Sequence, residues 1–218
     1  MKYKYGIFDL DGTIINTMPT YTKVFLEVLN RKFKLKINIE DSNKYYLNSA
    51  GTPLGVQFQQ VLKNNHISFT NIEELVDEFF KIVNKKDFLM FEKAEIIIQH
   101  LHNKNISLFV STGSETENSK KILKKFNLLE CFSVILGSDK IIKGPDHIEE
   151  FAEFANLPIE EFTKQTFFCG DGVRDMEIAK TSGIYAIGIA QTIEKENLLE
   201  AGADVAVDKI GDILDVMT

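Results

Sequence analysis

The chain has 218 residues, of which 44% are hydrophobic, 26% charged and 11% aromatic. This composition excludes a disordered protein, and the length predicts one full domain with a sizeable insert or a small second domain. The formal net charge is −7, and Arg31 and Arg174 are the only arginines, which argues against nucleic-acid binding.

Cysteine usage and the N-terminal segment predict the compartment. Cys131 and Cys169 form no CxxC pair and cannot build a disulfide scaffold, which favours a reducing environment. The chain reaches Asp9 before an apolar run of signal-peptide length can form, and no apolar stretch is long enough to span a bilayer. We therefore expect a cytoplasmic protein without a membrane partner. These patterns predict no particular oligomeric state.

The first strand is expected at residues 5–8, and the stretch after it is helical. Apolar residues recur on one helical face in two segments, and a weaker helix follows Gly51, Thr52 and Pro53. No strand pattern in this stretch is convincing. The expected helices of the insert cover residues 18–29, 54–64 and 72–83.

Strands and helices alternate after residue 100. Short buried runs predict strands at 107–110, 133–136, 166–169 and 185–189. Helical spacing predicts helices at 115–129, 146–156 and 175–182, with Ser114 placed to cap the first of them. This alternation predicts an α/β fold with a Rossmann-like, doubly wound parallel sheet. The expected domains are an α/β core at 1–15 and 91–218 and an all-helical insert at 16–90.

Polar residues follow the ends of the predicted strands, where open α/β sheets bind ligands. If the first strand stays extended, Asp9 and Asp11 point to one side, and Gly12 lets the chain turn. Lys143 is preferred over Lys140 because Gly144 and Pro145 open a helix directly after it. The other candidates at strand ends are Ser111, Thr112, Asp171 and Asp175.

These residue types suit phosphoryl transfer. Neighbouring carboxylates repel one another, which raises their pKa values or recruits a cation. A ligand set made only of oxygen atoms favours a hard ion, and Mg²⁺ is expected. Hydroxyl groups, loop amides and a lysine suit the oxygens of a phosphate. A carboxylate nucleophile beside a hard cation and a cationic clamp indicates an aspartyl-phosphate intermediate.

The segment Asp9-Leu10-Asp11-Gly12-Thr13 resembles the first motif of the haloacid dehalogenase superfamily, in its phosphatase branch. Ser111, Lys143 and the pair Asp171 and Asp175 fill the second, third and fourth motifs in order. The helical insert looks like the C1 cap of this superfamily, and the phosphoglycolate-phosphatase-like subgroup is the most similar one.

The resemblance implies roles for the first-motif residues. Asp9 would attack phosphorus and carry the phosphoryl group. Asp11 would protonate the leaving oxygen and then take a proton from the hydrolytic water. Mg²⁺ would be bound by the side chains of Asp9 and Asp171 and by the backbone carbonyl of Asp11. Asp175 would bind it through water or orient its ligands.

The resemblance also implies how substrate is held. Lys143 and the hydroxyl of Ser111 would bind the phosphate, and Thr112 could supply that hydroxyl instead. The cap loop with Gly51 and Thr52 would face the leaving group and select the substrate.

The expected function is a Mg²⁺-dependent phosphomonoester phosphatase acting on a small phosphorylated metabolite. One alternative is a phosphosugar mutase, which is disfavoured because Tyr21 stands where such enzymes often carry a histidine. Another is a phospho-acceptor signalling module without turnover. A metal-independent dehalogenase is disfavoured by Asp11. His147 could face the site, but a surface position is expected for it, and Cys169 is expected to be a core residue.

Overall fold

The computed structural model describes residues 2–34 and 52–217 of the chain. Two compact units are present: a core unit, residues 1–16 and 90–218, and a helical unit, residues 17–89. Among the described residues, no helix combines the length and the apolar character that crossing a membrane requires.

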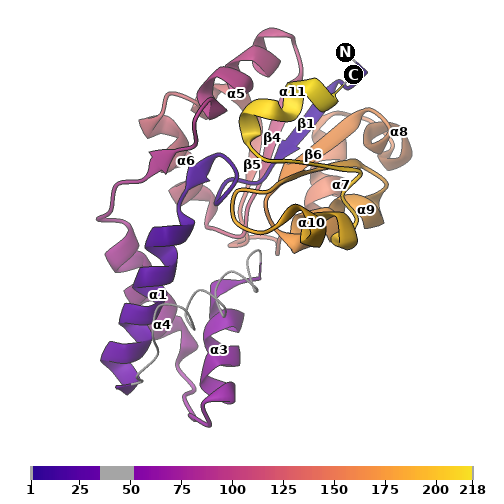
Figure 1. The fold of residues 1–218 in the computed structure, drawn as a ribbon. Coiled ribbons are helices and arrows are strands. Elements are labelled where there is room, and N and C mark those ends of the chain that lie inside the picture. The colour runs from indigo at the N-terminus through magenta and orange to yellow at the C-terminus, as the bar shows by residue number, and fades with distance from the viewer. Residues whose placement is uncertain (1, 35–51, 218) are drawn as a thin grey trace. The chain divides into compact units, whose positions relative to one another are not determined.

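The core unit contains a six-stranded parallel sheet (Figure 1). Its order is β5 (Phe132–Leu136), β4 (Ser107–Ser111), β1 (Tyr5–Phe8), β6 (Thr166–Gly170), β7 (Tyr185–Ile189) and β8 (Val205–Val207). The predicted doubly wound α/β fold is confirmed, and β8 is an additional edge strand. Because the strand order reverses at β1, the carboxyl ends of β1, β4 and β6 meet at one place on the sheet edge.

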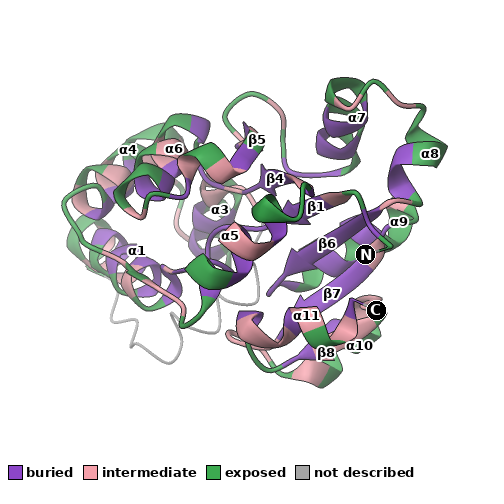
Figure 2. Ribbon diagram, turned by 90° about the horizontal axis from the view of Figure 1, so that it is seen from above, coloured by how far each residue is buried: buried purple, intermediate pink, exposed green. Residues whose placement is uncertain are grey.

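Helices cover both faces of this sheet (Figure 1). They are α5 (Ala94–Asn103), α6 (Thr116–Lys125), α7 (Pro145–Phe154), α8 (Ile159–Thr163), α9 (Val173–Ser182), α10 (Lys195–Ala201) and α11 (Ile213–Val216). Helices α7 to α10 pack on one face, where Phe109 stacks on Phe151 with ring centroids 4.8 Å apart. The central strands β1, β4, β6 and β7 are largely buried, as Figure 2 shows in purple, which explains their continuous apolar runs.

The predicted helix cap at Ser114 is wrong. Helix α6 begins one residue later than expected, its N-cap is Glu115, and no side chain caps it. The Ser114 hydroxyl instead contacts a carboxylate at the end of β1, as described below.

The helical unit contains α1 (Met18–Phe33), α3 (Leu54–Asn64) and α4 (Ile72–Val83) at the positions that the apolar spacing predicts. Its core is aromatic: the rings of Phe25 and Phe58 stack at 4.6 Å, and Tyr21 meets Phe79 edge-on at 5.4 Å. Two-residue strands β2 (Ile15–Asn16) and β3 (Leu89–Met90) pair with each other where the chain leaves and re-enters the core unit.

Candidate active site

A sharp turn follows β1 and depends on Gly12. This residue has φ +88°, which disfavours any residue with a Cβ, and an added Cβ would lie 2.3 Å from Asp171 Oδ2. The turn leaves both Asp9 and Asp11 buried at the carboxyl edge of the sheet. Glycine is therefore required here both for backbone conformation and for the close approach of a carboxylate from β6.

Lys143 is the buried cation of the site. It is 2% exposed, and its Nζ lies 2.6 Å from Asp9 Oδ1 and 2.5 Å from Asp175 Oδ1. Burial alone would lower the pKa of Lys143, but the carboxylates of Asp175 and Asp9 raise it above its ordinary value. The lysine is therefore charged. Of the two lysines considered from the sequence, Lys140 is exposed and Lys143 lies within the cluster.

Three buried carboxylates gather around this lysine. Asp9, Asp171 and Asp175 each offer an oxygen, and these oxygens lie within 4.8 Å of one another. Burial raises the pKa of Asp9 well above its ordinary value; Lys143 opposes this, and the neighbouring carboxylates add to it. Burial, and then the charge of Asp175, raises the pKa of Asp171 to about 6. A buried set of repelling oxygen ligands fits a hard divalent cation, which would relieve the repulsion.

Asp11 lies apart from this group and contacts hydroxyls after β4. Its Oδ2 accepts hydrogen bonds from Ser114 Oγ at 2.6 Å and from Thr112 Oγ1 at 3.3 Å. Its Oδ1 is buried and has no hydrogen-bond partner among the described residues. One carboxylate oxygen is thus held by two hydroxyl groups, and the other has no hydrogen-bond partner among the described residues.

The expected surface position of His147 is wrong, because its side chain is fully buried. Its Nδ1 lies 2.9 Å from Ser111 Oγ. His147 shares the inner face of α7 with Ile148, Phe151 and Ala152. The spacing from His147 to Phe151 is one helical turn, which is the sequence signal that could have placed the histidine inside.

Residues of the loop after β7, which are not among the predicted site residues, form hydrogen bonds with the acidic site. Thr192 Oγ1 donates a short hydrogen bond to Asp171 Oδ2, and Thr13 Oγ1 donates to Asp171 Oδ1 at 2.7 Å. Gln191 Nε2 lies 3.2 Å from the carbonyl oxygens of both Gly12 and Thr13. Gln191 and Thr192 follow the carboxyl end of a predicted strand, so the strand-end rule could have identified them.

The predicted cap-loop residues are only partly described. Gly51 lies outside the described residues, and the Thr52 carbonyl accepts a hydrogen bond from Gln57 Nε2 at 2.8 Å. Arg31 is exposed and pairs with Glu78 at 2.9 Å within the helical unit.

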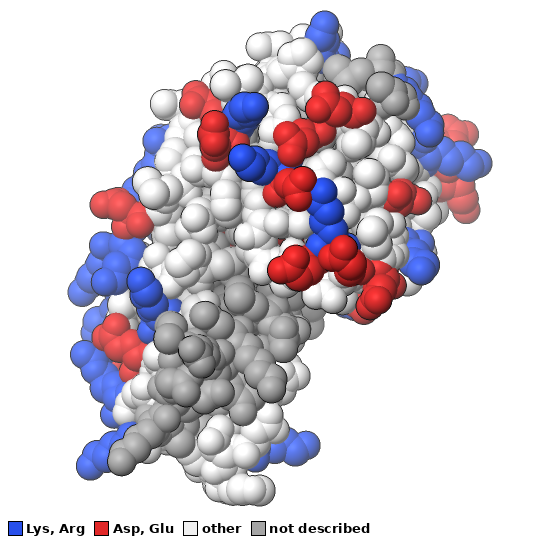
Figure 3. All heavy atoms as spheres, in the orientation of Figure 1, with Lys and Arg blue, Asp and Glu red and all other residues white. Residues whose placement is uncertain are grey.

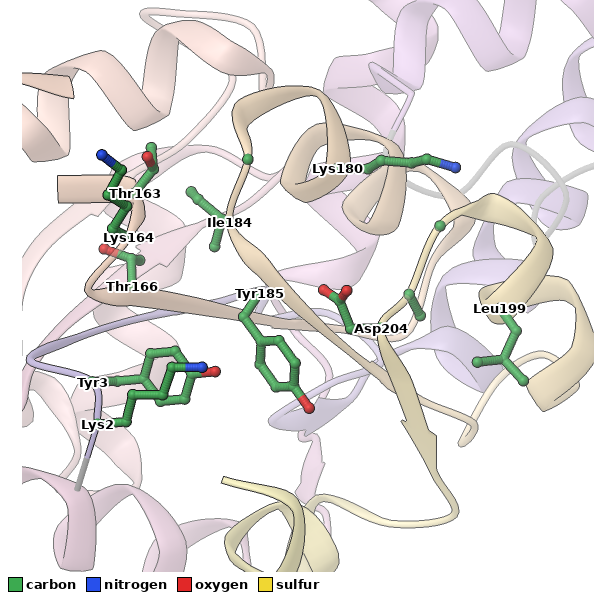
Figure 4. A pocket seen from close by; sticks show the side chains of 13 residues that line it. Lys2, Tyr3, Thr163, Lys164, Thr166, Lys180, Ile184, Tyr185, Leu199 and Asp204 are labelled. Carbon is green, nitrogen blue, oxygen red and sulfur yellow. The ribbon is translucent and has the colours of Figure 1, made fainter. Parts of the chain in front are cut away.

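A hollow of about 590 Å³ opens at the opposite, amino edge of the sheet (Figure 4). Tyr3 and Tyr185 stack there with centroids 5.5 Å apart, and Lys2 Nζ lies 5.2 Å from the centre of the Tyr3 ring. The nearby Asp204 carboxylate accepts a hydrogen bond from the Ala186 N–H at 2.7 Å. This hollow has no cluster of carboxylates among the described residues.

Charged side chains of both signs are interspersed over the core unit on the face shown in Figure 3. The charges of the acidic site, in contrast, are nearly inaccessible: Asp9 is 5% and Asp175 3% exposed. The clustered carboxylates at the carboxyl edge are therefore buried.

Residues 6–189 match the family described as haloacid dehalogenase-like hydrolase. The chain therefore belongs to the haloacid dehalogenase-like hydrolases, which confirms the resemblance found in the sequence and the prediction of an enzyme.

Relatives and solved structures cover nearly the whole chain. Pyrophosphatase PpaX of Anoxybacillus flavithermus is 25% identical over 97% of this chain and 95% of its own length. Pyrophosphatase PpaX of Halalkalibacterium halodurans is 25% identical over 100% and 98%. Among solved structures, a "predicted phosphoglycolate phosphatase" from Haemophilus somnus superposes with a TM-score of 0.84 at 19% identity, covering 100% of this chain and 99% of that one. At that identity the structural likeness concerns the fold.

Proposed function

We propose that the protein is a Mg²⁺-dependent phosphomonoester phosphatase that hydrolyses a small phosphorylated metabolite through an aspartyl-phosphate. One observation carries this proposal: the Asp9 carboxylate pairs with a buried lysine, 2.6 Å away, and is one of three carboxylates whose oxygens lie within 4.8 Å of one another. This arrangement can hold a nucleophile, a cation and a phosphate together in a site closed to water.

The proposed reaction has two displacements. An Asp9 oxygen forms a bond to phosphorus while the bond to the leaving oxygen breaks, and Asp11 gives that oxygen a proton. Water then attacks phosphorus, Asp11 takes its proton, and the bond to Asp9 breaks to release inorganic phosphate. The unpartnered Oδ1 of Asp11 supports this role, because an acid–base group needs an oxygen not already held by donors.

Asp9 must be ionised to attack, although burial raises its pKa. The charge of Lys143 opposes that shift. A Mg²⁺ ion held by Asp9, Asp171 and the Asp11 backbone carbonyl would supply further positive charge for the phosphoryl oxygens, and Asp175 would bind it through water or orient its ligands. Lys143 then neutralises charge on both Asp9 and the phosphate.

Of the two hydroxyl groups after β4, we assign phosphate binding to Ser111. Thr112 Oγ1 already accepts from Ser114 N at 3.1 Å and contacts Asp11. Ser111 follows Val110, which pairs with Phe8, so Ser111 and Asp9 each lie one residue beyond the last pair of β4 and β1. This register supports a shared role at the phosphate.

We propose that the helical unit is a cap that chooses the leaving group, with Gly51 and Thr52 in its substrate loop. The names of the relatives suggest two substrates to test first, inorganic pyrophosphate and phosphoglycolate. Both cysteines are free, as the proposed cytoplasmic location requires.

The test is release of inorganic phosphate from a panel of phosphorylated metabolites that includes pyrophosphate, phosphoglycolate, sugar phosphates and nucleotides. Turnover with Mg²⁺ that is lost with EDTA and in Asp9→Asn supports the proposal. Stable phosphorylation of Asp9 without turnover, or metal-independent release, would contradict it.

A further inference from the structure

The His147 ring lies between two oxygens: a carbonyl oxygen, which can only accept a hydrogen bond, and a hydroxyl oxygen, which can donate or accept one. Its Nε2 lies 2.9 Å from the backbone carbonyl oxygen of Ile141, and its Nδ1 lies 2.9 Å from Ser111 Oγ. A carbonyl oxygen can only accept, so Nε2 must carry a hydrogen. In a neutral ring Nδ1 is then an acceptor, and the Ser111 hydroxyl must donate its single proton to it.

That hydrogen bond conflicts with phosphate binding. A phosphate oxygen also accepts, so Ser111 can donate to the phosphate only by withdrawing its proton from His147. A neutral Nδ1 would then face a Ser111 lone pair with no hydrogen between them. Both side chains are fully buried, so water does not replace the lost partner without a rearrangement.

Protonation of the ring removes the conflict. A doubly protonated His147 donates from Nε2 to the Ile141 carbonyl and from Nδ1 to Ser111, which leaves the Ser111 proton for the phosphate. The negative charge of the bound anion also favours a cation two hydrogen bonds away.

We propose that binding of a phosphate dianion at Ser111 is coupled to the uptake of one proton by His147. This inference rests on the phosphate-binding role proposed above for Ser111. It makes His147 a positioning residue, because the ring acts on the phosphate only through the serine hydroxyl.

The surroundings keep the ring neutral until the anion arrives. Burial lowers the pKa of His147, and the Ile141 carbonyl opposes this. Among the described residues, the charged groups that act on the ring are Lys143, which disfavours protonation, and Asp146, which favours it. The Lys143 charge is balanced by its ion pairs with Asp9 and Asp175. The Phe151 ring, whose centroid lies 6.3 Å from that of His147, carries no charge.

The test uses sulfate, a dianion that does not titrate near neutral pH, with Mg²⁺ present. Calorimetric titrations in buffers of different ionisation enthalpy give the number of protons taken up per sulfate. We expect His147 to add close to one proton, so that its contribution raises the sulfate affinity about tenfold for each unit fall in pH between the pKa of the bound state and the lower pKa of the free ring. In His147→Asn, which keeps a neutral hydrogen-bonding group, this contribution disappears. His102→Asn, the same change at an exposed histidine of the core unit, leaves it unchanged.

A measurement on the unaltered protein complements the variants. Side-chain ¹⁵N shifts of His147 should show the Nε2–H tautomer in the free protein at pH 7 and two protonated nitrogens at saturating sulfate. Equal proton uptake in the protein and in His147→Asn, a ring that stays neutral with sulfate bound, or no sulfate binding would each overturn the inference. Hydrolysis of p-nitrophenyl phosphate tests the proposed phosphatase separately, so the two can fail independently.

Discussion

The two edges of the same parallel sheet use polar residues in opposite ways. At the carboxyl edge, Asp9 and Asp171 are buried beside Lys143, and repulsion and burial raise the pKa values of both carboxyl groups. At the amino edge, aromatic stacking of Tyr3 on Tyr185 lines an open hollow, and Asp204 is exposed and bonded to a backbone N–H. The sheet thus concentrates mutually repelling carboxylates at one edge, where a bound cation would relieve the repulsion.

The largest expected effect is on turnover in Asp9→Asn. The neutral amide cannot form the acyl-phosphate, so the rate should fall by about three orders of magnitude or more, measured as phosphate release from p-nitrophenyl phosphate with Mg²⁺. The matched change at the amino edge, Tyr185→Phe, should leave turnover unchanged. Comparable losses in both variants would break the distinction between the two edges.

Removal of the buried cation should cause the largest loss of stability. Lys143→Met leaves Asp9 and Asp175 without their ion-pair partner and should lower the free energy of unfolding by about 3–5 kcal/mol in metal-free buffer. Lys140→Met, at an exposed position in the same loop, should change it by less than about 0.5 kcal/mol. Urea unfolding followed by circular dichroism measures both, and similar losses would show that Lys143 is not a structural counter-ion.

The pH dependence of stability gives the next effect. Burial raises the pKa of Asp171 from its ordinary value of 3.8 to about 6, so the folded state binds more protons than the unfolded state between these values. Its carboxyl group therefore lowers stability as pH rises through this window, by about 2–3 kcal/mol when ionisation is complete. Without metal, the urea midpoint of the unaltered protein should fall relative to that of Asp171→Asn between pH 4 and pH 7.

Mg²⁺ should oppose this loss, because a cation stabilises the ionised carboxylates. At pH 7 the ion should raise the melting temperature of the unaltered protein and have a smaller effect on Asp171→Asn. A melting temperature that does not respond to Mg²⁺, with or without Asp171, would contradict the assignment of the metal ligands.

Two glycines with positive φ, one at each edge of the sheet, allow the same substitution to be compared at both edges. Gly12→Ala adds a Cβ 2.3 Å from Asp171 Oδ2 to an already strained backbone, and we expect a loss of about 2 kcal/mol or more. Gly183, at the amino edge, has φ +70° but open space around its Cβ position, so Gly183→Ala should cost only the backbone strain, about 1 kcal/mol. Chemical denaturation measures both losses in the free energy of unfolding. Equal losses would mean that the Asp171 side chain moves away from the added Cβ without an energetic penalty.

A strand or helix can be predicted from the sequence only where its burial leaves a pattern of apolar residues. The central strands were predicted because strands buried on both faces are continuous apolar runs. The three residues of β8 were missed because an edge strand with half-buried side chains gives no such run. Helix α6 begins at Thr116 and frees the Ser114 hydroxyl for Asp11, a tertiary contact that overrides local capping preference.

The acidic cluster was predictable because the strand-end rule applies to single residues after apolar runs. The interactions around it were not, because they join residues far apart in the chain: Thr192 to Asp171 across two strand ends, and His147 to Ser111 across β4 and α7. A buried polar pair is recognised only when both partners are known. For that reason the sequence alone predicts a surface position for His147, whose partner Ser111 is distant along the chain.

The smallest expected effect concerns the amino edge alone. Burial and, less strongly, the charge of Asp204 raise the pKa values of Tyr3 and Tyr185. Asp204→Asn should lower both, which is visible in the ultraviolet titration of the tyrosines. Its side-chain carbonyl can still accept from the Ala186 N–H, so the free energy of unfolding should change by less than about 1 kcal/mol. Since this edge lies away from the proposed chemistry, turnover with Mg²⁺ should be unaltered. A change in turnover would mean that charge at the amino edge affects the carboxylates at the carboxyl edge.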